Sequence, residues 1–242
     1  MDHIAHVYVW EKLGANIHGF IPETNYLLNL HNFFEGFGFN DAMDFSIIEK
    51  FAKMNEYHEC NNVNPIKPGS KLKFENFTFE TIPFQGHSLA NVGFYLPEER
   101  ILHIGCLGFD LSEPNSEGFG PWYGFKQCSI PQYLKDIDFA ENLYLEKANF
   151  LISSHGYIVK NPDRYPFNYM RKKIENNQLK INQALKSLNL SIKSKDKSIK
   201  KLLKMELFFP KRKISNFMLK IYALWEYWII QKHVQRSNLF KN

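Results

Sequence analysis

The chain has 242 residues and a mass of 28.6 kDa, which suits one substantial domain or two small ones. Hydrophobic residues make up 44% and aromatic residues 16%, with 22 Phe, so the composition excludes a disordered or low-complexity protein. No apolar run reaches the roughly 18 residues that a bilayer-spanning helix needs, because Lys220 and Glu226 interrupt the most apolar stretch.

Cysteine usage and the first residues indicate the compartment. Cys60, Cys106 and Cys128 are too few and too scattered for a disulfide framework. Residues 1–4 lack the basic segment and the uninterrupted apolar core of a secretion signal. We therefore expect a reduced, cytoplasmic protein.

The formal net charge of +5 hides two oppositely charged halves. Residues 1–159 carry 10 basic against 20 acidic side chains, a charge of −10, whereas residues 160–242 carry 20 against 5, a charge of +15. Such a tail can contact nucleic acid or an anionic membrane surface, and it can equally dock on the acidic half. Since solvated Lys-rich helices are common, we favour docking on the chain's own domain or on that of a second subunit.

The first distinctive segment, residues 33–46, is rich in Phe and Gly and has no clean periodicity. It fits a flexible apolar lid over a pocket, and it fits equally a loop whose Phe side chains plug the edge of a core. Both interpretations predict a loop.

Two hairpins follow along the chain. Residues 71–74 and 77–82 alternate apolar and polar side chains on either side of a two-residue turn. Residues 92–96 and 101–105 form the second pair.

A helix over residues 130–146 and a strand at 150–154 come next. Strands that arrive as a run and are then separated by a helix predict a layered, β-rich α/β sheet.

Beyond Pro166 the hydrophobic period becomes that of helices. Two stripes carry this signal: Ile174, Ile181, Leu185 and Leu188, then Phe217, Ile221, Leu224 and Trp228. Between them, the Ser- and Lys-rich residues 187–201 predict a mobile connection and the start of a middle helix at Ile199, Leu202 and Leu203.

Three chemically capable side chains, His87, Cys106 and His155, follow directly after predicted strands. Side chains at strand ends converge on one edge of a sheet, and imidazole with thiolate suits zinc. Asp2 and His3, at the start of a predicted helix, add a carboxylate and another imidazole. Each residue alone also has a simpler interpretation, as a hydrogen-bonded turn histidine or a small core cysteine.

Together these residues resemble the metallo-β-lactamase fold superfamily, over roughly residues 1–160. The segment 79–88, followed by 92–96, is similar to the superfamily's strand, third-histidine loop and next strand, and the resemblance ends at Ser154-His155-Gly156. Nineteen residues after the histidine, where most members have a metal-bridging Asp, this chain has Cys106. Some metallo-β-lactamases use Cys there, although a thiolate at this position gives up the carboxylate bridge between two metals.

The superfamily signature begins His-x-His-x-Asp-His, and Asp2-His3 resemble its final pair. The two leading histidines would then lie before Met1. Either the sequence starts late or the protein has lost half of one metal site, and the reading frame upstream of Met1 distinguishes the two.

The resemblance implies two unequal metal sites. The first would keep only His87, whereas the second would keep Asp2, His3, Cys106 and His155, sufficient for one tetrahedral zinc ion. A second ion would require an upstream extension. In a catalytic site Asp2 would also orient the nucleophile. If all four residues bind the ion, a hydrolytic water requires expansion of the coordination shell or loss of one ligand. A structural site is the alternative.

Residues 119–124 form an aromatic turn that resembles a segment some members place beside the metal. There it could wall a substrate pocket, and a simple packed turn is the alternative. Asp110, in the preceding loop, could supply a carboxylate in place of Cys106.

The other histidines, at positions 6, 18, 31, 58, 103 and 233, have no partners at ligand spacing. We interpret His6 as a helix-surface residue and His103 as a strand residue. The aromatic stripe within residues 225–233 resembles the helical extension of larger members and favours a docking face over a cofactor site.

The fold class implied is α/β, a four-layer αββα sandwich at residues 1–160 with a basic helical extension at 161–242. The activity implied is metal-dependent hydrolysis, with zinc, of a small-molecule ester, thioester, lactone or similar bond. Two alternatives stay open: a degenerate, non-catalytic member that binds a ligand or partner, and a nucleic-acid-processing member that uses the basic tail. A homodimer is compatible with each.

Overall fold

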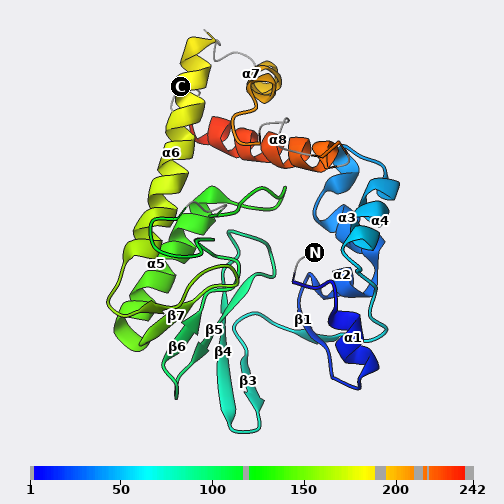
Figure 1. The fold of residues 1–242 in the computed structure, drawn as a ribbon, viewed down its shortest axis with the longest axis vertical. Helices are drawn as coiled ribbons and strands as arrows, with labels where there is room; N and C mark the ends of the chain where they lie inside the picture. The colour runs from blue at the N-terminus through cyan, green and yellow to red at the C-terminus, as the bar shows by residue number, and fades with distance from the viewer. Residues whose placement is uncertain (1–2, 117–119, 189–194, 210–214, 217, 238–242) are drawn as a thin grey trace.

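The computed structural model describes residues 3–116, 120–188, 195–209, 215–216 and 218–237. Figure 1 shows the arrangement of the elements. The helices are α1 (Val7–Lys12), α2 (Thr24–Leu28), α3 (Leu30–Gly36), η1 (Phe39–Asp41), α4 (Phe45–Met54), α5 (Ile130–Lys147), α6 (Tyr165–Ser187), α7 (Lys195–Leu202), η2 (Leu203–Met205) and α8 (Leu219–Arg236). The strands are β1 (His18–Phe20), β2 (Asn64–Ile66), β3 (Lys71–Phe74), β4 (Phe77–Pro83), β5 (Val92–Leu96), β6 (Ile101–His103), β7 (Phe150–Ile152) and β8 (Val159–Lys160).

A six-stranded sheet in the order β3-β4-β5-β6-β7-β8 is the larger of the two sheets in the described residues. Both predicted hairpins are confirmed. β3 pairs antiparallel with β4 through a turn that contains Glu75 (φ 51°), and β5 pairs antiparallel with β6 through a turn that contains Arg100 (φ 55°). After the predicted helix α5, β7 pairs in parallel with β6. β6 ends at His103, two residues earlier than expected, because Gly105 turns the chain with a φ of 57°.

The two faces of this sheet contact different layers. Tyr95 and Leu102 are cross-strand partners on the face covered by α5, where the Tyr95 hydroxyl donates to the Lys147 carbonyl at 3.1 Å. On the other face, Phe94 lies 6.0 Å from Phe20 of β1, measured between ring centroids. β1 belongs to a parallel two-stranded sheet with β2, and α1 and α2 lie beyond it (Figure 1). The α/β class and the order helix, sheet, sheet, helix are thus confirmed, the second sheet having two strands in the described residues.

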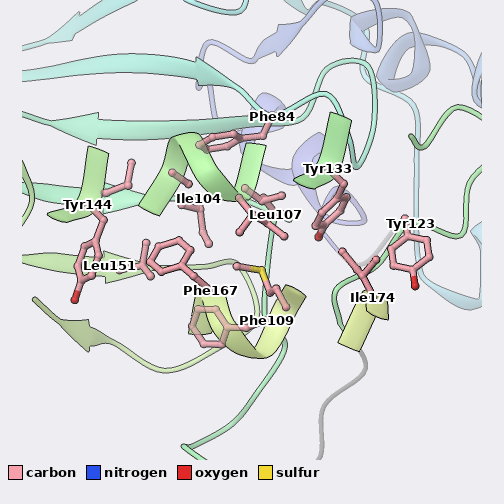
Figure 2. Close-up of a cluster of buried hydrophobic side chains, with 14 of the residues drawn as sticks. Phe84, Ile104, Leu107, Phe109, Tyr123, Tyr133, Tyr144, Leu151, Phe167 and Ile174 are labelled. Carbon is pink, nitrogen blue, oxygen red and sulfur yellow. The ribbon is translucent and has the colours of Figure 1, made fainter. Parts of the chain in front are cut away.

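The main core lies between the six-stranded sheet and the helices α5 and α6 (Figure 2). α5 begins after Ser129, whose hydroxyl accepts a hydrogen bond from the Gln132 amide at 3.3 Å. Its buried Tyr133, Ile137, Ala140 and Tyr144 recur at spacings of four, three and four, the period of one helix face. This face fixes α5 against the sheet.

The prediction of a loop across residues 33–46 is wrong. The segment contains the end of α3, the turn η1 and the start of α4. α3 begins because the Asn29 side chain accepts from the amides of His31 (2.7 Å) and Asn32 (3.2 Å). It ends before Gly38, which adopts a φ of 79°. Only short pieces of helix lie in this segment, so its apolar residues show no helical period in the sequence.

The C-terminal helices pack on the rest of the chain through the predicted apolar stripes. Ile174 of α6 joins the main core, whereas Ile181 and Leu185 pack with α7 and the end of α8. Ile221, Leu224 and Trp228 of α8 pack on α3, η1 and α4, and α8 bridges these helices to α6 (Figure 1). Phe217 and residues 189–194 lie outside the described residues.

The middle helix is confirmed as α7 followed by η2, but α7 begins at Lys195, four residues before the predicted start at Ile199. The division into 1–160 and 161–242 stays a prediction. Across the described part of the chain, no helix combines the length and apolarity needed to cross a membrane.

Candidate metal centre

Three ligand-type side chains from distant segments meet at one end of the six-stranded sheet. The candidate ligand atoms of His3, Cys106 and His155 all lie within 4.8 Å of one another. His3 Nε2 lies 3.2 Å from Cys106 Sγ and 2.8 Å from His155 Nε2. Both imidazoles are exposed and the thiol is partly exposed, so the cluster opens to solvent.

The parallel pairing of β6 with β7 brings Cys106 and His155 together. This pairing continues past both strands, where the Ile104 amide donates to the Ile152 carbonyl at 2.8 Å and the Ser154 amide donates to the Gly105 carbonyl at 3.0 Å. The chain segments that carry Cys106 and His155 therefore leave the sheet side by side.

His3 reaches the cluster from a turn that precedes α1, rather than from the predicted helix start. α1 is fixed from its other end, where Glu11 accepts hydrogen bonds from the amides of Asn61 (2.9 Å) and Asn62 (2.6 Å). These bonds lower the pKa of the Glu11 carboxyl. Loop residues 61–62, just before β2, thus fix the end of α1 that is opposite to His3.

The donor set fits a zinc ion. Two imidazole nitrogens and a thiolate are preferred zinc ligands, and tetrahedral geometry with Zn–N bonds of 2.0–2.1 Å places two nitrogens about 3.3 Å apart. The observed nitrogen separation of 2.8 Å would need to open by only about 0.5 Å, small for side chains at an exposed edge. Asp2, the fourth ligand implied by the resemblance, lies outside the described residues.

His87 lines the same cleft but does not belong to the three-residue cluster. Its loop lies directly on α5: a Cβ on Gly86 would come within 2.3 Å of Tyr133 Cα, and the Gly86 amide donates to Asp136 at 2.7 Å. His87 Nδ1 is 2.8 Å from the Trp122 carbonyl, which can only accept. Nδ1 therefore carries the proton, and in the neutral ring Nε2 has the lone pair that a metal ligand needs.

Asp110, the alternative carboxylate, also lines the cleft. It has a φ of 49°, and its carboxyl packs so close to Gly120 that a Cβ there would come within 2.6 Å of Oδ2. Like His87, it is not in the three-residue cluster.

The cluster lines a cleft of about 1020 Å³, a volume just above the usual range of small-molecule sites. The predicted aromatic turn takes part in the wall: Trp122 lines the cleft, while Tyr123 is buried in the main core. Other parts of the wall come from residues that the sequence did not single out individually, namely Tyr26, Phe33, Phe37, Phe39, Phe51, Phe125, Met218, Tyr222 and Trp225.

Glu23 and His103 are two further polar residues of the cleft. Burial raises the pKa of the Glu23 carboxyl, although hydrogen bonds from Ser88, Ala90 and Gln127 partly oppose this. His103 was interpreted only as a strand residue, and it is one, but it also lines the cleft. Neither residue has a local sequence pattern that marks it.

Comparisons with known proteins establish the fold. No family model matches the chain, and no curated protein matches it. Among solved structures, a metallo-beta-lactamase family protein from Thermus thermophilus is 16% identical, with a TM-score of 0.56 over 94% of this chain and 68% of that one. The chain thus has the metallo-β-lactamase fold, as the resemblance implied.

Two other solved structures are similar over a smaller part of the chain. An archaeal metallo-beta-lactamase superfamily protein from Sulfolobus tokodaii is 10% identical, covering 72% of this chain and 63% of that one, with a TM-score of 0.49. A metallo-beta-lactamase from Pontibacter korlensis is 15% identical, covering 70% and 62%, with a TM-score of 0.46. The chain thus spans less than two thirds of either protein.

Proposed function

We propose that this chain is a metal-dependent hydrolase that uses zinc and acts on an ester, thioester, lactone or similar bond. The observation that carries the proposal is the convergence of His3, Cys106 and His155 within 4.8 Å on the lining of a large cleft. Asp2 completes the proposed ligand set, and His87 is a further candidate ligand on the cleft wall.

A zinc ion held by these residues would lower the pKa of its bound water to near 7 and polarise a carbonyl group. The chain's own residues define the surroundings. The Trp122 carbonyl holds His87 in one tautomer, and the exposed side of the cluster admits substrate from the cleft. Asp2 is the proposed residue that orients the nucleophile.

The first prediction concerns metal content. Purified protein should hold about one zinc ion per chain after dialysis, and Cys106→Ser should weaken binding at least about 10-fold, a loss seen even for residues that only support a ligand. Cobalt substitution should give a thiolate-to-metal charge-transfer band in the native protein and lose it in the variant. Elemental analysis and absorption spectroscopy measure the two effects.

Cys60→Ser is the matched control, because Cys60 is buried and lies outside the cluster. It should keep both the metal and the charge-transfer band. A metal content near zero, or a cobalt band that survives Cys106→Ser, would contradict the ligand assignment. Bound zinc without turnover of any ester would instead favour the non-catalytic alternative.

A further inference from the structure

The cleft extends from the metal cluster into a chamber walled by aromatic side chains. One edge of the wall begins at His87, whose ring lies 5.8 Å from Phe125, measured between centroids. Phe125 then contacts Trp122 at 5.8 Å and Phe37 at 4.7 Å, and Trp122 contacts Trp225 at 5.0 Å. A continuous aromatic surface therefore connects a candidate ligand to the interior of the cleft.

Three separate parts of the chain build this chamber. α3 and the residue that follows it supply Phe33 and Phe37, the turn after Gly120 supplies Trp122, and α8 supplies Trp225. The C-terminal helix is thus part of the wall rather than only a support behind it. An apolar ligand in the chamber would bury surface against each of the three, which favours its binding.

The charge of the residues that line the cleft also bears on which ligands it can bind. Among the described residues that line the cleft, none is Lys or Arg, whereas Glu23 and Asp110 contribute carboxyl groups. A polyanion needs basic side chains along its path, and backbone phosphates would meet these carboxyl groups instead. The exposed lysines of α7 are not in the lining.

We propose that the cleft selects a neutral substrate with a bulky apolar acyl or aromatic group, which occupies the chamber walled by Phe37, Phe125, Trp122 and Trp225. This inference rests on the proposed function, since it places the scissile bond at the metal cluster. It disfavours nucleic acid as the ligand of this cleft.

The test measures binding separately from turnover. The full-length protein is titrated with the neutral fluorophore N-phenyl-naphthylamine, both zinc-loaded and after chelation. Saturable fluorescence enhancement should appear in both forms, because the chamber walls are protein side chains. Methyl decanoate should displace the probe at least about 10-fold more effectively than methyl acetate, because its longer acyl chain buries more apolar surface in the chamber. A thymidine oligonucleotide should not displace it.

Trp225→Ala should weaken probe binding about 10-fold, the effect of losing a large aromatic contact surface. Trp10→Ala is the matched control, since Trp10 is 62% exposed on α1 and does not line the cleft. Met218→Ala is a second wall variant, milder in volume, and circular dichroism and thermal melting verify that each variant folds. Lack of saturable binding, equal binding by the wall variants and the control, or displacement by the oligonucleotide would overturn the inference.

Turnover of para-nitrophenyl acetate and para-nitrophenyl decanoate separates this inference from the proposed function. A lower KM for the decanoate supports both. Probe binding with no turnover of either ester supports the chamber and contradicts the hydrolase. Turnover without probe binding or chain-length preference contradicts the chamber and leaves the hydrolase standing.

Discussion

His233 is an imidazole that the fold keeps neutral. It is fully buried on α8, its Nδ1 lies 3.0 Å from Gln178 Oε1, and its Nε2 lies 3.0 Å from the Tyr123 hydroxyl. Burial, with Arg236 and Lys232 nearby, lowers its pKa to about 3. A neutral ring that donates from Nδ1 and accepts at Nε2 satisfies both contacts.

This shift predicts how stability depends on pH. Since the folded pKa is below the usual value of 6.5, the unfolded chain takes up a proton that the folded chain rejects as pH falls from about 6.5 towards 3. The free energy of unfolding should fall across that window, with a limiting slope of about 1.4 kcal/mol per pH unit for one proton. Urea unfolding from pH 7 to 4.5 measures it.

His233→Gln should have a lower free energy of unfolding at pH 7 and a flatter slope from 6.5 to 4.5. His103, whose pKa burial also lowers, adds to the wild-type slope, so the comparison rests on the difference between the two proteins. The control is His6→Gln, at an exposed position. Equal slopes in His233→Gln and wild type would contradict the assignment.

At the residue scale, the sequence located the candidate site better than its surroundings. Cys106 and His155 could be placed together because both follow strands, and strand ends share an edge of the sheet. His3 required the family resemblance, since no local pattern links residue 3 to residue 155. Phe37 belongs to the segment 33–46, for which a lid over a pocket was one of two interpretations, but the sequence did not place Trp225 beside it, because only the tertiary packing of α8 on the N-terminal helices brings the two together.

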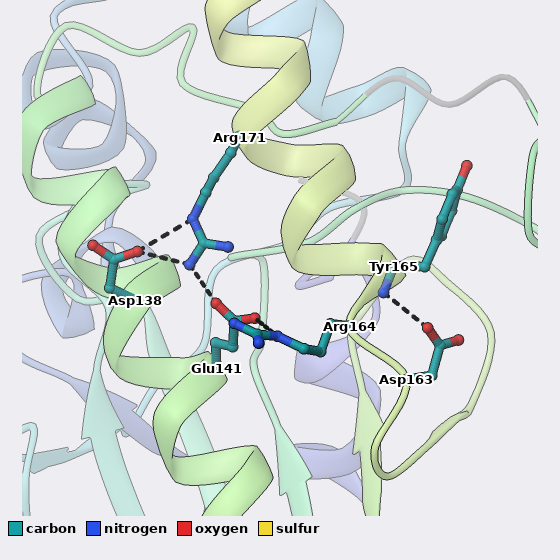
Figure 3. Close-up of polar contacts among 6 residues, drawn as sticks. All are labelled: Asp138, Glu141, Asp163, Arg164, Tyr165 and Arg171. Carbon is teal, nitrogen blue, oxygen red and sulfur yellow. Dashed lines mark hydrogen bonds and ion pairs between the residues drawn. The ribbon is translucent and has the colours of Figure 1, made fainter.

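At the scale of elements, an ion-pair network joins α5 to α6 (Figure 3). Glu141, 3% exposed, accepts from Arg164 at 2.6 Å and from Arg171 at 2.5 Å, and Arg171 also donates to Asp138 at 2.7 Å. Burial alone would raise the pKa of Glu141, but the two guanidinium groups outweigh it and the pKa lies below its usual range. The network therefore stabilises the packing of the two helices while Glu141 is ionised.

Glu141→Gln should lower the free energy of unfolding at pH 7 by roughly 1–3 kcal/mol, the cost of weakening charged hydrogen bonds at a buried carboxylate. Because the folded pKa is lowered, this contribution is present above about pH 4.5 and is lost as pH falls through the folded value. The difference between wild type and variant in urea unfolding should thus shrink at pH 3.5. Glu146→Gln, on exposed surface of the same helix, is the control. A difference independent of pH would contradict this account.

Elements with a regular apolar pattern over several residues were predicted from the sequence, whereas a short helix without such a pattern was missed. The hairpins and α5 were predicted because alternation and helical spacing extend over several residues in each. α3 was missed because it has seven residues, too few for a period to be visible, and its stability comes from burying Phe33 and Phe34 against α8. The α8 stripe was predicted, but its partner surface was not, since that surface is made of the missed helices.

At the scale of the whole molecule, the two oppositely charged halves contact each other through apolar faces. Ile174 lies in the main core, and Leu224 and Trp228 lie in the cluster with α3 and η1. The basic side chains of α7 point the other way: Lys195, Lys200 and Lys201 are exposed. The tail therefore uses its apolar stripes for folding and leaves much of its positive charge to solvent.

That arrangement predicts weak, salt-sensitive binding to nucleic acid. Exposed lysines attract phosphates without recognising a sequence, and the affinity comes mainly from counterion release. A mobility shift with RNA or DNA should be visible at low salt and vanish near 150 mM, where the screening length is about 8 Å. Lys200→Glu with Lys201→Glu should abolish the low-salt shift without changing the melting temperature, whereas Lys12→Glu with Lys53→Glu, on exposed surface of the N-terminal helices, should reduce it less. Submicromolar binding that persists above about 150 mM salt would show instead that the basic surface is a nucleic-acid module.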